Sequence, residues 1–369
     1  MSDMSRLTVH RDGQPCYDII YAADFSGLPG ALSALGSGSR RICIVTDTVV
    51  GPLYAGEVLR AVREVSPQVQ VYTIPAGEEN KTLDEIRGLY RFLVTERYDR
   101  SSLLIALGGG VIGDMTGYAA ATFLRGIDFV QIPTTLLAQA DSSIGGKTGV
   151  DFDGFKNMVG AFKMPALVYE NVSVLKTLDA RQFASGFAEV MKHGLIKDQA
   201  YYEWLLAHMK EIRSRVPGVL QAMLRRSNEI KKDVVENDPY EKGERMLLNY
   251  GHTLGHAIEK EQNFTLTHGE CVALGCVAAA HIAKARGWLD SDEYYEIRDM
   301  FVPFGLPITV SGVDAERVIT LTKSDKKAKG GIPRFVLLKA VGEAVVAEDV
   351  TEEEMRAALG EIIWKEDME

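Results

Sequence analysis

The sequence predicts an α/β N-terminal domain with a mostly parallel, nucleotide-binding sheet, followed by a mainly α-helical C-terminal domain. Two observations predict this. Between residues 40 and 134, short β-branched runs alternate with helical patterns, and from about residue 178 apolar residues recur at helical spacing. A chain of 369 residues is long enough for two domains. We expect domain limits of 1–177 and 178–369, with a ligand in the cleft between them.

The first domain is expected to contain buried strands connected by amphipathic helices. We place strands at 40–47, 69–75, 101–109 and 128–134, and helices at 54–65, 81–98 and 114–124. Strand–helix alternation of this kind produces a parallel sheet, and ligands of such sheets bind at the carboxyl ends of the strands.

The second domain is expected to consist of helices and one late hairpin. The helical patterns cover 179–196, 199–212, 219–236, 249–260 and 270–287. Asp179 is a suitable N-cap, and Gln182 three residues later suggests a capping box. A hairpin is expected over 334–350, before a terminal helix that begins near Thr351.

Composition excludes several classes of function. The net charge of −10 argues against binding of nucleic acid or anionic membranes, because both require a basic surface. The first residues lack the apolar core of a signal peptide, and the uncharged apolar run 271–283 is too short to span a bilayer. The four cysteines lack paired spacing and are read as buried thiols in a reducing compartment. We therefore expect a cytoplasmic protein that does not contact nucleic acid or membrane.

A glycine-rich turn follows the strand predicted at 101–109. Gly108, Gly109 and Gly110 leave room for a pyrophosphate beside the N-terminus of the next helix, and "GGGVIG" fits the dinucleotide fingerprint. A tight turn without a ligand is the alternative. Asp47 ends an earlier strand, where it could accept a bond from a ribose hydroxyl or cap the following helix.

A lysine-rich segment, 141–160, contains Lys147, Lys156 and Asn157. It lacks the glycine spacing of a P-loop, so a nucleoside triphosphate site is not predicted. The two ammonium groups suit a phosphate or a carboxylate. Taken alone, the segment fits a solvated surface loop better.

Histidine spacing raises the question of a metal. His252 and His256 lie four residues apart on one helix face, His268 follows, and Glu189 lies in an apolar helix with Lys192 one turn later. Two imidazoles and a carboxylate form a catalytic metal set with an open position. Spacing alone favours His252 and His256 as the ligand pair and does not exclude His193.

Several motifs together identify a family resemblance. The sequence contains "GGGVIGDMTGYAAATFLRGI", "PTTLLAQADSSIGGKTGVD", "KN", "GFAEVMKHG", "LNYGHTLGHA" and "HGECVALG" in this order. The series resembles the 3-dehydroquinate synthases, a family of sugar-phosphate cyclases, over about residues 40 to 340. Aspartate at position 179 and proline at position 239 depart from the family pattern, but both lie outside the motifs.

The resemblance implies a tightly held NAD, one divalent metal (zinc most often, with cobalt as an alternative) and a homodimer. It implies Glu189, His252 and His268 as metal ligands, which makes His256 a neighbour of the site. The implied NAD residues are Asp47, Glu78, Lys81, Gly108, Gly109, Gly110, Asp114, Thr134, Thr135, Thr177 and Leu178. Asp141, Lys147 and Lys156 are expected beside both cofactor and substrate. Around the substrate the resemblance implies Asn157, Lys192, Lys231, Arg245, Asn249, His256, Lys327 in preference to Lys326, and Arg125 from a neighbouring subunit.

The family reaction converts 3-deoxy-D-arabino-heptulosonate 7-phosphate to 3-dehydroquinate and phosphate in the shikimate pathway. The resemblance implies transient oxidation by NAD, phosphate elimination, re-reduction, ring opening and an intramolecular aldol closure. The alternatives are another sugar-phosphate cyclase, such as a 2-deoxy-scyllo-inosose synthase, and a metal-dependent polyol dehydrogenase. A binding protein on a degenerate cyclase fold is a further alternative, which an intact metal set argues against.

Overall fold

The computed structural model describes residues 5–323 and 333–364. The chain forms two compact units: Met1–Leu178 with Leu220–Lys232, and Asp179–Val219 with Asp233–Glu369. A helical segment from the later half of the chain thus groups with the first unit. The functional domain limits at residues 177 and 178 remain a prediction.

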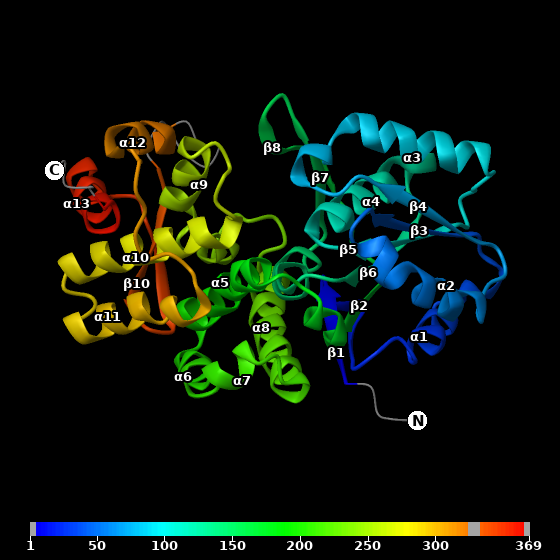
Figure 1. The fold of residues 1–369 in the computed structure, drawn as a ribbon, viewed down its shortest axis with the longest axis horizontal. Helices are drawn as coiled ribbons and strands as arrows, with labels where there is room; N and C mark the ends of the chain where they lie inside the picture. Colours follow the sequence, from blue (N-terminus) through cyan, green and yellow to red (C-terminus); the bar gives the residue numbers. More distant parts are fainter. Residues whose placement is uncertain (1–4, 324–332, 365–369) are drawn as a thin grey trace. The chain divides into compact units, whose positions relative to one another are not determined.

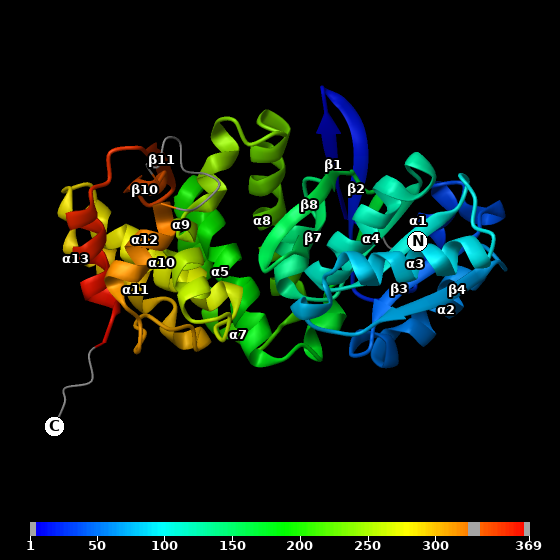
Figure 2. The same ribbon diagram turned by 90° about the horizontal axis from the view of Figure 1, so that it is seen from above.

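The first unit contains a seven-stranded sheet that is parallel except for one edge strand. Its order is β1-β2-β9-β6-β5-β3-β4, and β1 pairs antiparallel with β2. The expected α/β class with a mostly parallel sheet is confirmed. Figure 2 shows β1 and β2 side by side. The strands are β1 (Arg6–Arg11), β2 (Gln14–Ala22), β3 (Ile42–Asp47), β4 (Val69–Ile74), β5 (Leu103–Gly108), β6 (Asp128–Pro133) and β9 (Leu167–Asn171).

Helices cover both faces of this sheet (Figure 1). The helices α1 (Leu28–Ala34) and α2 (Gly56–Arg63) share one apolar core with the sheet, and α3 (Leu83–Thr95) and α4 (Gly110–Thr122) share another. All six residues of β3 and of β5 are buried. Strands covered on both faces read as continuous apolar runs, which is why these two were recognisable in the sequence.

Short irregular helices occupy several connections at the strand ends. They are η1 (Ser37–Ser39), η2 (Gly51–Ala55), η3 (Glu78–Asn80), η4 (Phe123–Arg125), η5 (Ala138–Ser142) and η6 (Val172–Lys176). Because β6, β5, β3 and β4 are neighbours and parallel, the segments that follow them meet at one edge of the sheet.

The lysine-rich segment forms a separate hairpin, although no strand was expected there. It consists of β7 (Lys147–Phe152) and β8 (Phe155–Phe162), paired antiparallel. Most side chains of β8 are exposed, so the segment shows no apolar alternation that could have marked it as a strand.

The second unit is mainly helical, with α10 (His268–Ala285) at its centre. Fourteen of its residues are buried, and it packs against α5, α9, α11, α13 and β10. The expected hairpin near the end of the chain is present as β10 (Phe335–Ala340) and β11 (Glu343–Ala347). The other helices are α5 (Ala180–Lys197), α6 (Gln199–Ala207), α7 (Met209–Arg213), η7 (Glu244–Asn249), α9 (His252–Glu261), α11 (Ser291–Asp299), η8 (Val302–Phe304), α12 (Ala315–Lys323) and α13 (Glu352–Ile362). The helix α8 (Pro217–Asn237) has its middle in the first unit.

Side-chain caps fix where several of these helices begin. The Asp179 carboxylate accepts bonds from the backbone N–H of Arg181 and Gln182, so the expected N-cap of α5 is confirmed. The suggested capping box is not completed, because the Gln182 side chain does not bond back to the Asp179 backbone. Complete capping boxes are present at α10, α11 and α13, each with glutamate at the third position. The box at α13 begins with Thr351, near which the terminal helix was expected to begin.

One carboxyl group is buried in the sheet core. Glu170 on β9 has no exposed surface, and Asn228 on α8 donates to its Oε1 at 2.9 Å. The other carboxyl oxygen and Asn228 Oδ1 are also buried, and neither has a hydrogen-bond partner within the described part of the chain. Burial raises the pKa of Glu170 well above its ordinary value, although the bond from Asn228 opposes this.

All four cysteines are free, as expected, but Cys16 is exposed. The expectation of four buried thiols was therefore wrong for Cys16, because it lies on the half-exposed strand β2. Within residues 5–323 and 333–364, no helix has the length and apolar character needed to cross a bilayer.

Candidate active site

The glycine-rich turn connects β5 to α4, at the carboxyl edge of the sheet. Gly109 is the N-cap of α4 and has no side chain to occupy the helix N-terminus. A Cβ at Gly109 would lie 3.0 Å from Thr135 Cγ2, and one at Gly110 would lie 3.0 Å from Ser142 Oγ. Beside the turn, Thr134 donates its backbone N–H to the Gly108 carbonyl at 3.0 Å. The turn therefore presents open backbone N–H groups where an anionic group can approach.

The Thr134 hydroxyl has no hydrogen-bond partner among the described residues. The residue is 4% exposed, and its Oγ1 is buried without a hydrogen-bond partner in the described ranges. Thr135 Oγ1 accepts a bond from the backbone N–H of Ala138 at 3.1 Å. A buried hydroxyl without a partner is costly, so Thr134 fits a group that binds a ligand.

Three predicted cofactor residues meet in one cluster with a predicted substrate residue. Lys81 is 4% exposed, and its Nζ lies 2.7 Å from Asp114 Oδ2, 2.6 Å from Asn157 Oδ1 and 3.8 Å from Glu78 Oε1. Burial by itself lowers the pKa of Lys81, but the charges of Asp114 and Glu78 outweigh burial and raise it. The lysine therefore stays charged, although it is buried.

Asp47 and Thr177 both have local partners. Asp47 Oδ1 accepts bonds from the backbone N–H of Val49 and Val50, at 2.8 and 2.7 Å. This is the capping geometry that the sequence left open as an alternative to a ribose contact. Thr177 Oγ1 lies 2.5 Å from the Tyr54 hydroxyl, and Leu178 follows it at the end of the unit.

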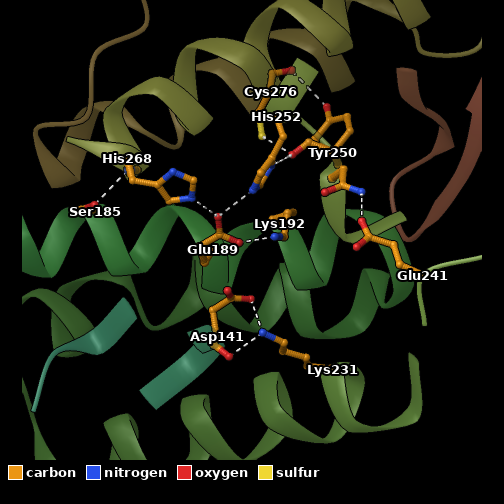
Figure 3. A network of polar contacts seen from close by, with 12 residues as sticks. Asp141, Ser185, Glu189, Lys192, Lys231, Glu241, Tyr250, His252, His268 and Cys276 are labelled. Carbon is orange, nitrogen blue, oxygen red and sulfur yellow. Dashed lines mark hydrogen bonds and ion pairs between the residues drawn. The ribbon is translucent and has the colours of Figure 1, made fainter. Parts of the chain in front are cut away.

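Lysines 147, 156 and 231 lie in the same unit. Lys231 on α8 is 4% exposed, and it donates to Asp141 Oδ1 at 2.5 Å (Figure 3). Lys147 begins β7, and Lys156 lies on β8, one residue before Asn157. Lys156 is therefore adjacent in sequence to Asn157, which accepts a bond from Lys81.

In the second unit, Glu189 lies among two imidazoles and a lysine (Figure 3). Its Oε1 is 3.4 Å from His252 Nε2 and 3.2 Å from His268 Nε2, and its Oε2 accepts a bond from Lys192. Ligand atoms around a tetrahedral zinc, with bonds of about 2.0–2.1 Å, are about 3.3 Å apart. The spacing of these three atoms therefore fits a shared metal.

His256 lies beside this group. Ligand atoms of His252, His256 and His268 are all within 4.8 Å of one another. The three histidines thus lie close to one another, and Glu189 Oε1 lies near two of them, His252 and His268. The assignment of Glu189, His252 and His268 as the metal ligands remains a prediction. Tyr250 holds His252: its carbonyl oxygen lies 3.0 Å from His252 Nδ1, which leaves Nε2 as the atom directed at Glu189.

Burial and neighbouring charges keep two of these donors, Glu189 and His252, in the form that binds metal. Burial would raise the pKa of Glu189, but the charge of Lys192 and then the imidazoles lower it well below the ordinary value. Burial, followed by the charge of Lys192, lowers the pKa of His252 well below its usual range. An ionised carboxylate and a neutral imidazole are the states in which these groups bind metal.

Glycines allow the helices of this group to approach closely. A Cβ at Gly275 on α10 would lie 1.8 Å from the Gly251 carbonyl oxygen, which precedes α9. A Cβ at Gly269 on α10 would lie 2.1 Å from the Ser185 carbonyl oxygen on α5. The helices that carry Glu189, His252 and His268 therefore touch through their backbones.

A loop before η7 organises two further predicted residues. Arg245 is 3% exposed, and its Nη1 donates to the Pro239 carbonyl at 2.7 Å. Asn249 Nδ2 donates to Glu241 Oε1 at 2.7 Å. Glu241 was not predicted, and only its position four residues before Arg245 could have indicated it.

Three further predicted residues are Arg125, Lys326 and Lys327. Arg125 is exposed in a turn where Leu124 and Arg125 both have positive φ, 50° and 70°. Lys326 and Lys327 lie outside the described residues.

Comparison with known proteins identifies relatives over most of the chain. The family models for the 3-dehydroquinate synthase N-terminal and C-terminal regions match residues 71–185 and 186–328. A 3-dehydroquinate synthase of Acetivibrio thermocellus is 46% identical over 330 residues, which cover 89% of this chain and 91% of that relative.

Two solved structures share the architecture. The 2-epi-5-epi-valiolone synthase ValA of Streptomyces hygroscopicus, with NAD+ and Zn2+ bound, has a TM-score of 0.86 and 27% identity, covering 96% of this chain and 98% of that one. A 2-deoxy-scyllo-inosose synthase complexed with carbaglucose-6-phosphate, NAD+ and Co2+ also has a TM-score of 0.86, at 23% identity, covering 96% and 99% of the two chains. The second likeness concerns the fold alone.

Proposed function

Because the chain belongs to the 3-dehydroquinate synthase family, we propose that it converts 3-deoxy-D-arabino-heptulosonate 7-phosphate to 3-dehydroquinate and phosphate. The observation that carries the proposal is the group formed by Glu189, His252 and His268, together with a dinucleotide-type turn on a parallel sheet. The net reaction contains no oxidation. It consists of phosphate elimination, ring opening and intramolecular aldol closure, enabled by a temporary oxidation of the substrate.

The residues fit both cofactors that this chemistry requires. One carboxylate and two imidazole nitrogens, spaced by 3.2 and 3.4 Å, form a donor set for zinc or cobalt. The uncapped helix N-terminus at Gly109 and the buried Thr134 hydroxyl suit NAD. When bound, NAD accepts and returns a hydride, and the metal polarises the oxygen at the same carbon.

The protein groups supply charge, orientation and order. Lys192 keeps Glu189 ionised, and the Tyr250 carbonyl fixes the orientation of His252. We assign Lys147, Lys156 and Arg245 to the phosphate and carboxylate of the substrate, because those anions need cationic partners once water is excluded. Asp141 is held by Lys231, so its carboxylate has a fixed position. Holding the open-chain intermediate in one conformation promotes ring closure by bringing its reacting ends together.

We also propose that the protein is a homodimer. The exposed position of Arg125, in a turn with two left-handed residues, is compatible with a role toward the phosphate of a neighbouring subunit. Sedimentation velocity would show the dimer. Mixing Arg125→Ala subunits with subunits inactivated at Glu189 would then restore part of the activity, if Arg125 acts across the interface.

The decisive experiment measures phosphate release from the heptulosonate phosphate in the presence of NAD+ and Zn2+. We expect phosphate and 3-dehydroquinate in equal amounts, without accumulation of NADH. Glu189→Gln should abolish release, whereas Glu343→Gln, a substitution at an exposed position on β11, should not.

Two results would redirect the assignment. Phosphate release from glucose 6-phosphate in preference to the heptulosonate phosphate would indicate a different sugar-phosphate cyclase. Net NADH formation on a polyol would indicate a dehydrogenase. Neither result is expected, because the family models match 3-dehydroquinate synthase over residues 71–328.

A further inference from the structure

The β7–β8 hairpin contains an irregularity at Asp151. The pairing register shifts between Val150 and Phe152, so Asp151 lies at the break. Its Oδ1 accepts a bond from the backbone N–H of Asn157 at 2.7 Å. Asn157 has a φ of +52°, in the left-handed region, which asparagine tolerates better than most residues with a side chain but does not prefer. The carboxylate of Asp151 therefore stabilises an unusual backbone conformation at Asn157.

The same aspartate also holds the segment that carries Lys81. The backbone N–H of Asp151 donates to the Lys81 carbonyl at 2.8 Å. The Lys81 side chain in turn donates to Asn157 Oδ1 at 2.6 Å and to Asp114 Oδ2 at 2.7 Å. Asp151 thus contacts both partners of the Lys81–Asn157 bond through its own backbone and side chain.

We propose that Asp151 is a positioning residue that couples the dinucleotide-binding groups to the substrate-binding hairpin. It does so by fixing Asn157 in the conformation that accepts the bond from Lys81. The proposal rests on the proposed function and on the roles that the family resemblance implies, Lys81 at the dinucleotide and Asn157 at the substrate. Without Asp151, Asn157 can leave its left-handed conformation, and Lys81 then loses one of its two closest partners.

The test uses variants that separate the acceptor from the charge. Asp151→Ala removes the acceptor, and Asp151→Asn keeps an oxygen that can accept the bond from Asn157 while removing the charge. Asp153→Asn removes a negative charge from an exposed position of the same hairpin, and asparagine tolerates the φ of +49° at that residue. Asp153→Asn is therefore the matched control.

The first readouts do not depend on turnover. In Asp151→Ala we expect faster hydrogen exchange at the Asn157 amide and a Kd for NAD+ that is raised about three- to tenfold, the effect of one lost hydrogen bond. Asp151→Asn and Asp153→Asn should resemble the unmodified enzyme in both. An unchanged Kd for NAD+ in Asp151→Ala, with only a lower Tm, would overturn the proposal.

Kinetics and a double-mutant cycle supply a second test. Asp151→Ala should raise the KM for the heptulosonate phosphate more than it lowers kcat. Asn157→Gly keeps the left-handed backbone accessible but removes the acceptor for Lys81. If Asp151 acts through Asn157, adding Asp151→Ala to Asn157→Gly should weaken NAD+ binding no further, whereas additive losses would contradict the coupling. If the unmodified enzyme did not use the heptulosonate phosphate, the proposed function would fail, but exchange and NAD+ binding would still decide the role of Asp151.

Discussion

Replacing Glu170 by glutamine should stabilise the protein at alkaline pH and have little effect on its stability at about pH 4. In the folded protein one carboxyl oxygen of Glu170 accepts from Asn228, and the other is buried beside no partner in the described ranges. Burial disfavours the charged carboxylate, so it favours the protonated form of Glu170. The protonated acid also has an O–H donor, which the carboxylate lacks. Glutamine has the same shape, retains the acceptor and places an N–H donor at the second position.

The sign of the pH dependence follows from linkage. The pKa of Glu170 is raised in the folded state, whereas the pKa of an unfolded glutamate is about 4.3. Its contribution to stability is therefore complete below about pH 4.3 and is lost as the pH rises through the folded pKa, because the folded state binds the proton more tightly. Each unit of increase corresponds to about 1.4 kcal/mol. A buried charged group without a partner costs about 1–3 kcal/mol or more, so we expect Glu170→Gln to gain at least about 2 kcal/mol by about pH 9.

Urea unfolding of both proteins across this pH range would measure the effect. Glu64→Gln, at an exposed position, is the matched control and should show no such pH-dependent gain. Infrared spectra provide an independent assay, since the band of a protonated carboxylic acid should disappear in Glu170→Gln. A difference in stability that stays constant with pH, or a band that persists in the variant, would refute the reasoning.

Three further substitutions test the site itself. Gly275→Ala would place a methyl group 1.8 Å from the Gly251 carbonyl oxygen. It should therefore lower the free energy of unfolding by about 1–3 kcal/mol or more and also weaken Zn2+ binding. An unchanged zinc affinity in a chelator competition would contradict this. Glu189→Gln should weaken Zn2+ binding more than about 100-fold, because a metal ligand contributes more to affinity than the surrounding groups that orient it. Calorimetric titration of the metal-free protein with Zn2+ would measure this. A smaller loss of affinity would mean that Glu189 is not a ligand. Thr134→Val removes a buried hydroxyl that has no hydrogen-bond partner within the described residues. The NAD-free protein should therefore be equally stable or more stable, whereas the Kd for NAD+ should rise about two- to tenfold. An unchanged Kd would exclude Thr134 from NAD binding.

The sequence predicted those parts of the fold whose burial is one-sided or complete. The strands β3 and β5 are continuous apolar runs because helices cover both faces of the sheet, and α3 is amphipathic. The β7–β8 hairpin could not be predicted in this way, because its exposed side chains follow no apolar pattern. The grouping of Leu220–Lys232 with the first unit depends on tertiary packing, which leaves no local signal.

At the candidate site, too, the sequence predicted local features but not the features that depend on tertiary packing. The spacing of His252 and His256 correctly indicated one helix face, but it contained no information on residues of other helices. Glu189 and His268 reach the group from α5 and α10. Both were candidates in the sequence, but only the family resemblance implied that they, and not His256, are ligands alongside His252. Asp151 and Glu241 were missed because their importance depends on the backbone and side-chain bonds that they accept, which single residues in a sequence do not reveal.

The close glycine contacts among α5, α9 and α10 have a consequence for the choice of metal. Because backbone atoms touch at Gly269 and Gly275, the helices cannot move apart to enlarge the coordination sphere without breaking packed main-chain contacts. Zn2+ and Co2+ have similar ionic radii and should exchange readily in such a frame. Ca2+ requires six to eight oxygen donors at about 2.3–2.6 Å, and should be rejected by geometry even when it is far more abundant.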